Sequence, residues 1–327
     1  MSDCLLSVII PAYNAQKFID NLLKKLLKQS ESIENIEIIV VNDGSKDSTQ
    51  SIVEDFVKDN KKIILINQEN KGESGARNAG ISAAKGKYLY FLDSDDDLED
   101  GTLPFYIKAL SENPEIQVFA FGYNSFYHNE KSKSYVSSAY DKNKLSQEEF
   151  IKLYLSKEIN CHICSIISER TLIQSCPLQF LIGLKIGADI DFLLRLFAVT
   201  KSFMYFSRSC YRYMIRDDSI MQGYKTYSKI QYHSFEIRRD LCLNEFYQSK
   251  RLRKYSNFWI ENQLLSNIVY YLKSSFCDDE ITQNLIKDCQ LLKRPISKGN
   301  LKNYLAIKIV KILPLKTIIK HKKRTNC

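Results

Sequence analysis

Residues 88–97, Tyr-Leu-Tyr-Phe-Leu-Asp-Ser-Asp-Asp-Asp, join an apolar run to a cluster of carboxylates. A continuous apolar run of this length indicates a strand that is buried on both faces, as in a parallel sheet. Asp93 and Asp95 follow at its carboxyl end, which is the edge of an open α/β sheet where ligands bind. Crowded carboxylates repel one another, and a hard divalent cation relieves that repulsion. The stretch therefore predicts a site for Mg²⁺ or Mn²⁺ carrying a diphosphate.

Other kinds of protein also place Asp-x-Asp after a strand. Asp-rich turns are common because Asp favours turns and helix caps. A calcium-binding loop is excluded, because Leu98 stands where that loop needs glycine and a strand, not a helix, comes before it. A phosphatase with an aspartyl nucleophile stays open on this stretch alone.

Three more apolar segments precede this strand, and a helical pattern follows each of them. The predicted strands are residues 6–10, 36–41 and 63–66. Helices are expected over residues 15–29, from a cap at Asp47 or Ser48 through Phe56, and after a loop over residues 70–80. Strands alternating with helices predict an α/β fold with a doubly wound, mainly parallel sheet.

Each predicted strand is followed by polar residues. Turn chemistry explains Asn, Asp and Gly at such positions, but it does not require an arginine in a glycine-rich loop. Together these residues predict a nucleotide crevice with carboxylates for base or ribose, a cation for phosphate and an Asp pair for metal. The residues are Tyr13, Asn14, Asp43, Arg77, Asn78, Asp93 and Asp95. The glycine spacing in residues 72–80 fits neither a dinucleotide fingerprint nor a P-loop.

Four motifs, in order and spacing, resemble those of family 2 glycosyltransferases with the GT-A fold. They are Pro-Ala-Tyr-Asn at 11–14, Val-Asn-Asp-Gly-Ser at 41–45, Asn-Lys-Gly at 70–72 with Ala-Arg-Asn-Ala-Gly at 76–80, and Phe-Leu-Asp-Ser-Asp-Asp at 91–96. The resemblance is closest over residues 5–105 and continues more loosely to about residue 220.

The resemblance assigns roles to these positions. It implies that Pro11, Tyr13, Asn14 and Asp43 lie at the donor's base and ribose and that Arg77 lies near the base or diphosphate. It also implies that Asp93 lies on the ribose or sugar side, and that Asp95 ligates Mn²⁺ or Mg²⁺.

A helix is expected to begin near Asp189, because apolar residues recur with helical spacing from residue 190 to 198. Asp191 and Arg195, four residues apart, are expected to pair. Asp189 has an ordinary interpretation as a helix N-cap. The resembled family has a Glu-Asp pair here whose Asp acts as general base on the acceptor hydroxyl, and Asp189 falls on that Asp. Ala188 replaces the Glu.

The remaining sequence divides by pattern. We expect residues 1–110 to form the nucleotide-sugar-binding half of the GT-A domain and residues 111–222 the acceptor-binding half, with a closing hairpin over residues 204–213. Residues 223–300 are predicted to be a helical extension of two or three amphipathic helices. Residues 301–327 hold seven Lys, one Arg and no acid, and predict a basic amphipathic tail that rests on an anionic membrane surface.

The net charge of +9 is a local property of this tail, because the other 300 residues sum to 9 − 8 = +1. The charge therefore gives no ground for nucleic-acid binding. Nine cysteines without an export signal suggest reduced thiols in a cytoplasmic protein. Cys161-His162-Ile163-Cys164 has no second pair, so core packing is favoured over a metal or redox site.

Together these features predict an inverting glycosyltransferase. It would move a sugar from a nucleotide-diphosphate donor, a UDP-sugar by the resemblance, to a hydroxyl of a cell-surface glycan or a lipid-linked oligosaccharide, at the cytoplasmic face of the membrane. Ala188 keeps a second hypothesis open, which is a catalytically impaired nucleotide-sugar- or glycan-binding subunit. A nucleotidyltransferase is a third, but residues 110–220 show no basic acceptor pocket.

Overall fold

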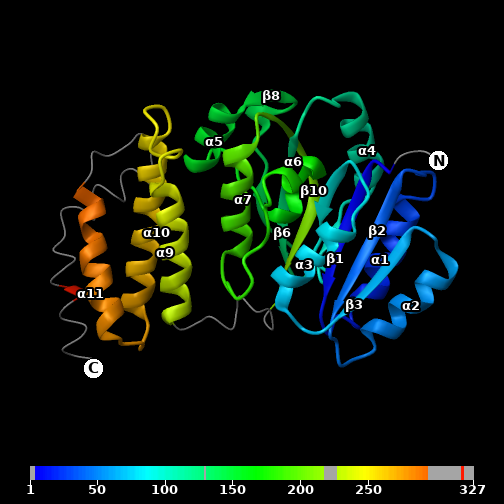
Figure 1. The fold of residues 1–327 in the computed structure, drawn as a ribbon, viewed down its shortest axis with the longest axis horizontal. Coiled ribbons are helices and arrows are strands. Elements are labelled where there is room, and N and C mark those ends of the chain that lie inside the picture. The colour runs from blue at the N-terminus through cyan, green and yellow to red at the C-terminus, as the bar shows by residue number, and fades with distance from the viewer. Residues whose placement is uncertain (1–3, 129, 217–226, 294–317, 320–327) are drawn as a thin grey trace. The chain divides into compact units, whose positions relative to one another are not determined.

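The computed structural model describes residues 4–128, 130–216, 227–293 and 318–319 (Figure 1). These residues form two compact units. The first holds residues up to 147, 160–184 and 188–215, and the second holds residues 148–159, 185–187 and those from 216 onward. Every candidate site residue lies in the first unit.

One sheet organises the first unit, in the strand order β3-β2-β1-β4-β9-β6-β10-β5, with β7 beside β6 and β8 beside β10. The strands are β1 (Leu6–Ala12), β2 (Ile36–Asp43), β3 (Ile63–Gln68), β4 (Tyr88–Phe91), β5 (Asp97–Leu98), β6 (Val118–Tyr127), β7 (Glu130–Tyr135), β8 (Asn143–Ser146), β9 (Ile166–Glu169) and β10 (Ser202–Ile215). The first four strands match the segments predicted from the apolar runs.

Strand direction gathers the site at one edge of this sheet. Strands β1, β2, β3 and β4 are parallel neighbours, so the residues that follow them emerge on the same edge. Strand β9 is antiparallel to β4 and β6. The segment that leads into β9 therefore starts from the edge where β4 ends, which brings His162 towards Asp93.

Helices of the first unit follow the strands, as the alternation predicted. They are α1 (Ile19–Gln29), α2 (Thr49–Asp59), α3 (Gly72–Ala83), α4 (Thr102–Glu112), α6 (Arg170–Ser175) and α7 (Ala188–Val199), with the short 3₁₀ turns η1 (Ser138–Tyr140) and η2 (Ile163–Ser165). Ser48 is the N-cap residue of α2 and makes no side-chain capping bond. Asp47, just before it, accepts a hydrogen bond at Oδ1 from the backbone N of Thr49 at 3.0 Å.

The prediction of a loop over residues 70–80 is wrong, because helix α3 already begins at Gly72. Its glycines serve packing. A Cβ built on Gly80 would lie 2.3 Å from Ile9 Cγ2, so only glycine lets the helix approach β1 this closely. Glu73 and Arg77 thus stand one turn apart on a helix, and their side chains form an ion pair.

The expected closing hairpin is also wrong. Residues 202–215 form the single strand β10, which is parallel to β6 with register shifts between Phe206 and Tyr211. Those shifts explain the break in the apolar pattern that suggested a turn. The polar segment after β6 folds back, since β7 pairs antiparallel with β6.

The second unit is helical, as predicted for residues 223–300. It contains α9 (Lys229–Leu243), α10 (Arg253–Lys273), α11 (Asp279–Asp288) and the turn η3 (Cys289–Lys293), together with most of α5 (Gln147–Leu155). Buried aromatic residues such as Tyr247 and Tyr271 pack its interior. Of the predicted basic tail only residues 318–319 are described, so that prediction lies outside the described residues.

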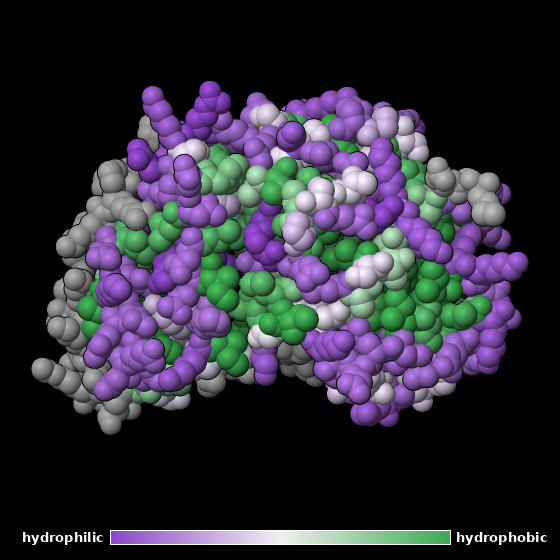
Figure 2. Space-filling view, in the orientation of Figure 1, coloured by the Kyte–Doolittle hydropathy of each residue, from purple (hydrophilic) through white to green (hydrophobic). Residues whose placement is uncertain are grey.

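Apolar side chains fill the interior of the sheet, and strands β1, β2 and β4 are buried along their whole length. Edge strand β3 is less covered, because Ile64, Leu65 and Ile66 are half-buried. Figure 2 shows apolar surface in the area of the first unit that holds β2 and β3. None of the helices in the described ranges is both long enough and apolar enough to span a bilayer.

Seven cysteines in the described part of the chain are free thiols. Cys164 is one of them and is buried, as the core-packing interpretation expected. Cys277 is in a disulfide, so the expectation of reduced thiols throughout is wrong at that residue.

Candidate functional site

The residues expected at the nucleotide base lie on adjacent strand ends. Pro11 is buried in β1, opposite Val41 of β2. Tyr13 follows β1 and exposes 51% of its surface, which makes its ring available for stacking. Asn14 holds a left-handed backbone with φ 51°, and its Oδ1 accepts a hydrogen bond from the backbone N of Lys46 at 2.8 Å.

Asp43 ends β2 and is buried, with 2% of its surface exposed. Its Oδ1 accepts hydrogen bonds from Gln68 Nε2 at 2.6 Å and from the backbone N of Lys71 at 2.9 Å. These bonds tie the end of β2 to the entry of α3 and fix the carboxylate's orientation. A ligand would meet Asp43 as a preset acceptor.

Arg77 is buried beneath the site, with 3% of its side chain exposed. A single nitrogen, Nη2, donates to Glu73 Oε1 and to Asp93 Oδ1, both at 2.6 Å. The guanidinium also lies over the Phe180 ring, with 5.2 Å to the centroid. Its Nε has no hydrogen-bond partner among the residues that the structure describes. In the described structure Arg77 thus binds two carboxylates of the site, which the sequence pattern did not suggest.

Asp95 and Asp96 occupy the turn that follows β4. Asp96 faces inward, where it accepts a hydrogen bond from the backbone N of Met214 at 2.7 Å and another from the hydroxyl of Tyr211. Burial, and then the charges of Asp93 and Asp95, raise the pKa of Asp96 well above its usual range. Asp95 is half-buried at the solvent side of the turn.

The residues at this turn fit a divalent cation shared with a ligand. Asp95 offers the oxygen donor that Mg²⁺ and Mn²⁺ prefer. Among the described residues, no three His, Cys, Asp or Glu side chains gather to hold a metal. A metal here would therefore take most of its ligands from water and phosphate, which is how Mg²⁺ binds in many phosphate sites.

Asp189 lies in the first turn of α7, as predicted. Asp191 and Arg195 pair as expected, with Arg195 Nε donating to Asp191 Oδ2 at 3.0 Å. The preceding segment is fixed at Phe180, whose backbone N donates to Asn78 Oδ1 at 2.8 Å. Its ring stacks on Phe192 with the centroids 4.0 Å apart. These contacts join α3, the loop and α7 around the site.

Several charges act on one another at this site. Arg77 lowers the pKa of Glu73, whereas the charges of Asp93, Asp189 and Asp95 raise it. Burial opposes ionisation of Asp93, yet its pKa is lowered because the guanidinium of Arg77 stabilises the carboxylate. Arg77 thus offsets part of the repulsion between carboxylates that a cation at the site would also relieve.

His162 is a residue of this site that the sequence pattern did not reveal. Its ring stacks on Tyr211 at 5.1 Å between centroids, and its Nδ1 accepts a hydrogen bond from the backbone N of Cys164 at 3.2 Å. Burial lowers its pKa, although Asp93 and Asp189 raise it. A neutral ring therefore carries its proton on Nε2. Glu73 was missed too, because its helical spacing to Arg77 lay in a segment predicted to be a loop.

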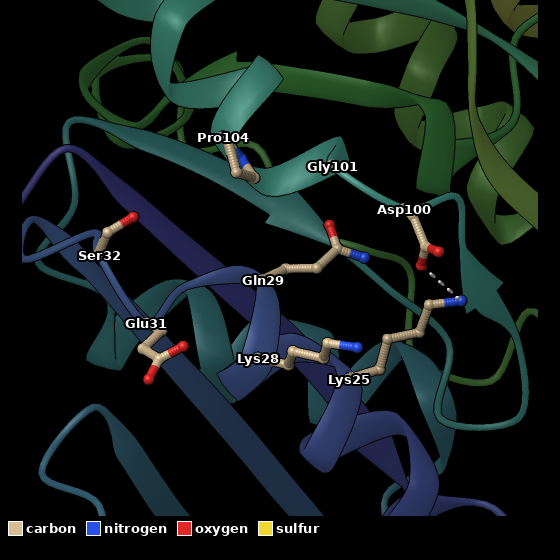
Figure 3. A pocket seen from close by; sticks show the side chains of 8 residues that line it. All are labelled: Lys25, Lys28, Gln29, Glu31, Ser32, Asp100, Gly101 and Pro104. Atoms are coloured by element: carbon tan, nitrogen blue, oxygen red, sulfur yellow. Dashed lines mark ion pairs between the residues drawn. The ribbon is translucent and has the colours of Figure 1, made fainter.

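A separate pocket of about 490 Å³ lies in the first unit between the end of α1 and the start of α4. Figure 3 shows Lys25 reaching towards Asp100, with Nζ and Oδ1 3.8 Å apart. Gln29 spans the same region, accepting from the backbone N of Leu103 and donating to the carbonyl of Glu99. No carboxylate of the site lines this pocket, so we place ligand binding at the sheet edge.

The chain belongs to glycosyl transferase family 2. The profile of that family, "Glycosyl transferase family 2", matches residues 7–174, which include every candidate residue except Asp189. The architecture agrees, because the mainly parallel sheet and the helices after it are those of the GT-A fold.

Two curated relatives are similar over about two thirds of the chain. Glycosyltransferase GlyA of Streptococcus pneumoniae serotype 4 is 32% identical over 228 residues, which are 67% of this chain and 32% of GlyA. Minor teichoic acid biosynthesis protein GgaB of Bacillus subtilis is 28% identical over 224 residues, or 67% of this chain and 24% of GgaB. The chain thus spans about a third or less of these two relatives.

A solved structure extends the similarity to the whole fold. Residues 1–349 of TarS from S. aureus, crystallised with UDP-GlcNAc, align with a TM-score of 0.69 at 20% identity. The alignment covers 98% of this chain and 89% of the TarS chain. At this identity the similarity establishes the fold.

Proposed function

We propose that this chain is an inverting glycosyltransferase that moves a sugar from a UDP-sugar to a hydroxyl of a cell-surface glycan or lipid-linked oligosaccharide. The observation that carries the proposal is that Asp93 and Asp95 follow β4 at the edge where Asp43 ends the parallel strand β2, while Asp189 lies in the first turn of α7, which Phe180 ties to α3. Family membership and the TarS structure with bound UDP-GlcNAc support the donor class.

The donor would lie along the carboxyl edge of the sheet. Tyr13 offers a ring for the base, and Asp43 offers a fixed acceptor for base or ribose hydrogen bonds. Asp93, held by Arg77, would accept from hydroxyls on the ribose or sugar side. Asp95 would hold Mn²⁺ or Mg²⁺, which when bound offsets the charge on the diphosphate.

The acceptor hydroxyl would approach from the side of Asp189. Asp189 removes its proton as the oxygen attacks the anomeric carbon, while the bond from that carbon to the diphosphate oxygen breaks. Direct displacement inverts the configuration, so an α-linked donor gives a β-linked product. The rate acceleration would come from orientation of the substrates and electrostatic stabilisation of the transition state, with no covalent intermediate.

Release of nucleoside diphosphate from a panel of UDP-, GDP- and dTDP-sugars tests this function. The assay compares Mn²⁺, Mg²⁺ and EDTA for the wild type and for Asp95→Ala. We expect turnover of a UDP-sugar that requires metal and is lost in the variant. Donor binding without turnover under every condition would instead favour a non-catalytic nucleotide-sugar-binding subunit, the alternative that Ala188 motivates.

Contact of the basic tail with an anionic membrane remains part of the proposal, on the charge pattern of residues 301–327 alone. A vesicle-flotation assay with and without anionic lipid checks it. Loss of flotation after truncation before residue 301 is the expected result.

A further inference from the structure

We propose that Glu73 is an acceptor-positioning residue, which orients the acceptor hydroxyl beside Asp189. The inference rests on the proposed function above and names a second carboxylate for it. Glu73 lies in the first turn of α3, at the same edge of the sheet as Asp93, which follows strand β4. The two carboxylates share one nitrogen of Arg77.

The two partners of Arg77 differ in their access to a ligand. The Asp93 side chain exposes 19% of its surface, whereas that of Glu73 exposes 55%. Arg77 Nη2 contacts only Oε1 of Glu73, and a carboxylate has about four lone-pair sites. Glu73 therefore keeps accepting capacity on its solvent side while its position is fixed from below.

Helices α3 and α7 are linked at Phe180, which bonds to Asn78 of α3 and stacks on Phe192 of α7, three residues after Asp189. The charge of Asp189 also acts on Glu73. A hydroxyl that loses its proton to one carboxylate needs further contacts to aim its oxygen at the reacting carbon. Ala188, beside Asp189 at the start of α7, has no polar side-chain atom to provide one. Glu73 lies on α3, so the second carboxylate beside the acceptor would come from a different helix than Asp189, which lies on α7.

A purely structural role would make Glu73 nearly dispensable. Arg77 is buried, but when Glu73 is lost it keeps Asp93, the less exposed of its two partners, so the guanidinium is not left unpaired. The positioning role instead predicts an effect on the acceptor. The two roles therefore differ in what a substitution changes.

The test is Glu73→Gln, because the amide oxygen still accepts from Arg77 while the negative charge is lost. Transfer from UDP-sugars to p-nitrophenyl glycosides is measured alongside hydrolysis of the same donor by water. We expect kcat/KM for the glycoside to fall about tenfold, as for loss of one hydrogen bond to a charged group. The donor KM and the hydrolysis rate, which do not involve the acceptor, should change much less than glycoside transfer.

Two further variants sharpen the result. Glu69→Gln removes an exposed glutamate just before α3 and should leave all rates unchanged. Adding Ala188→Glu to Glu73→Gln returns a carboxylate next to Asp189 and should restore much of the lost glycoside transfer. Restoration is an effect that a folding role of Glu73 would not produce.

The outcomes separate the two proposals. An unchanged glycoside kcat/KM in Glu73→Gln, or an equal loss of donor hydrolysis and transfer, overturns the positioning role while the glycosyltransferase stands. A wild type that turns over no nucleotide-sugar refutes the proposed function and this inference with it.

Discussion

Substitution of Arg77 should show how much its charge stabilises the buried carboxylate of Asp93. In Arg77→Met the buried guanidinium is replaced by an apolar chain, which leaves Asp93 without its cation. Breaking a buried ion pair by removing one partner costs about 3–5 kcal/mol. The Asp93 side chain retains 19% exposure, and Glu73 can turn to solvent. We therefore take the lower end of this range and expect the free energy of unfolding to fall by about 3 kcal/mol at pH 7.5.

The loss should depend on pH. The pKa of Asp93 is lowered in the folded wild type, so its ionised form stabilises the protein above the ordinary aspartate pKa, and this contribution is lost as pH falls through the lowered value. In Arg77→Met the unpaired, buried carboxylate should instead have a raised pKa. Protonation then relieves the penalty, and the difference between variant and wild type should shrink towards pH 5.

Urea unfolding followed by circular dichroism at pH 7.5 and pH 5 measures both effects. Arg77→Met/Asp93→Asn is the matched control, because removing the second charge should recover most of the stability at pH 7.5. Equal losses at both pH values, or a double variant as unstable as the single one, would refute the reasoning.

Three further predictions concern stability and use thermal unfolding. Phe180→Ala should lower the free energy of unfolding by about 3–4 kcal/mol, because a stacked, buried ring is lost. Ile182→Ala, at a side chain with 64% exposure, should change it little, and equal effects of the two variants would contradict the anchoring of this loop. Asp96→Asn should leave stability nearly unchanged, because its amide oxygen replaces a carboxyl with a raised pKa. Asp96→Ala should lower the free energy of unfolding by about 1–3 kcal/mol, because the Tyr211 hydroxyl and the backbone N of Met214 lose their acceptor. An alanine variant of wild-type stability would count against this. Gly80→Ala should cost about 1–3 kcal/mol because its Cβ would overlap Ile9, and a stable variant would show that α3 shifts freely.

The parallel half of the fold was predictable because its information is local. Each strand from β1 to β4 is a short apolar run with polar residues after it, and strand direction then places Asp43 and Asp93 at one edge. The start of helix α7 and the Asp191–Arg195 pair followed from helical spacing, whereas the role of Asp189 came from the family resemblance.

The errors arose where tertiary contacts decide the outcome. Three glycines and two asparagines in residues 70–80 indicated a loop, yet packing of Gly80 against Ile9 holds that segment as helix α3. The break between residues 206 and 211 suggested a hairpin, although pairing with β6 carries one strand through it. His162 could not be found from its neighbours, because only the antiparallel course of β9 brings it to the site.

The central claim is that this charged edge transfers a sugar with Asp189 as the base. Transfer from a UDP-sugar to a glycoside acceptor in Asp189→Asn, with donor affinity measured by calorimetry and Asp20→Asn as an exposed surface control, tests it most directly. We predict that transfer falls by about 10²–10⁴-fold while donor affinity and the control remain at wild-type values. Wild-type transfer by Asp189→Asn would contradict the account.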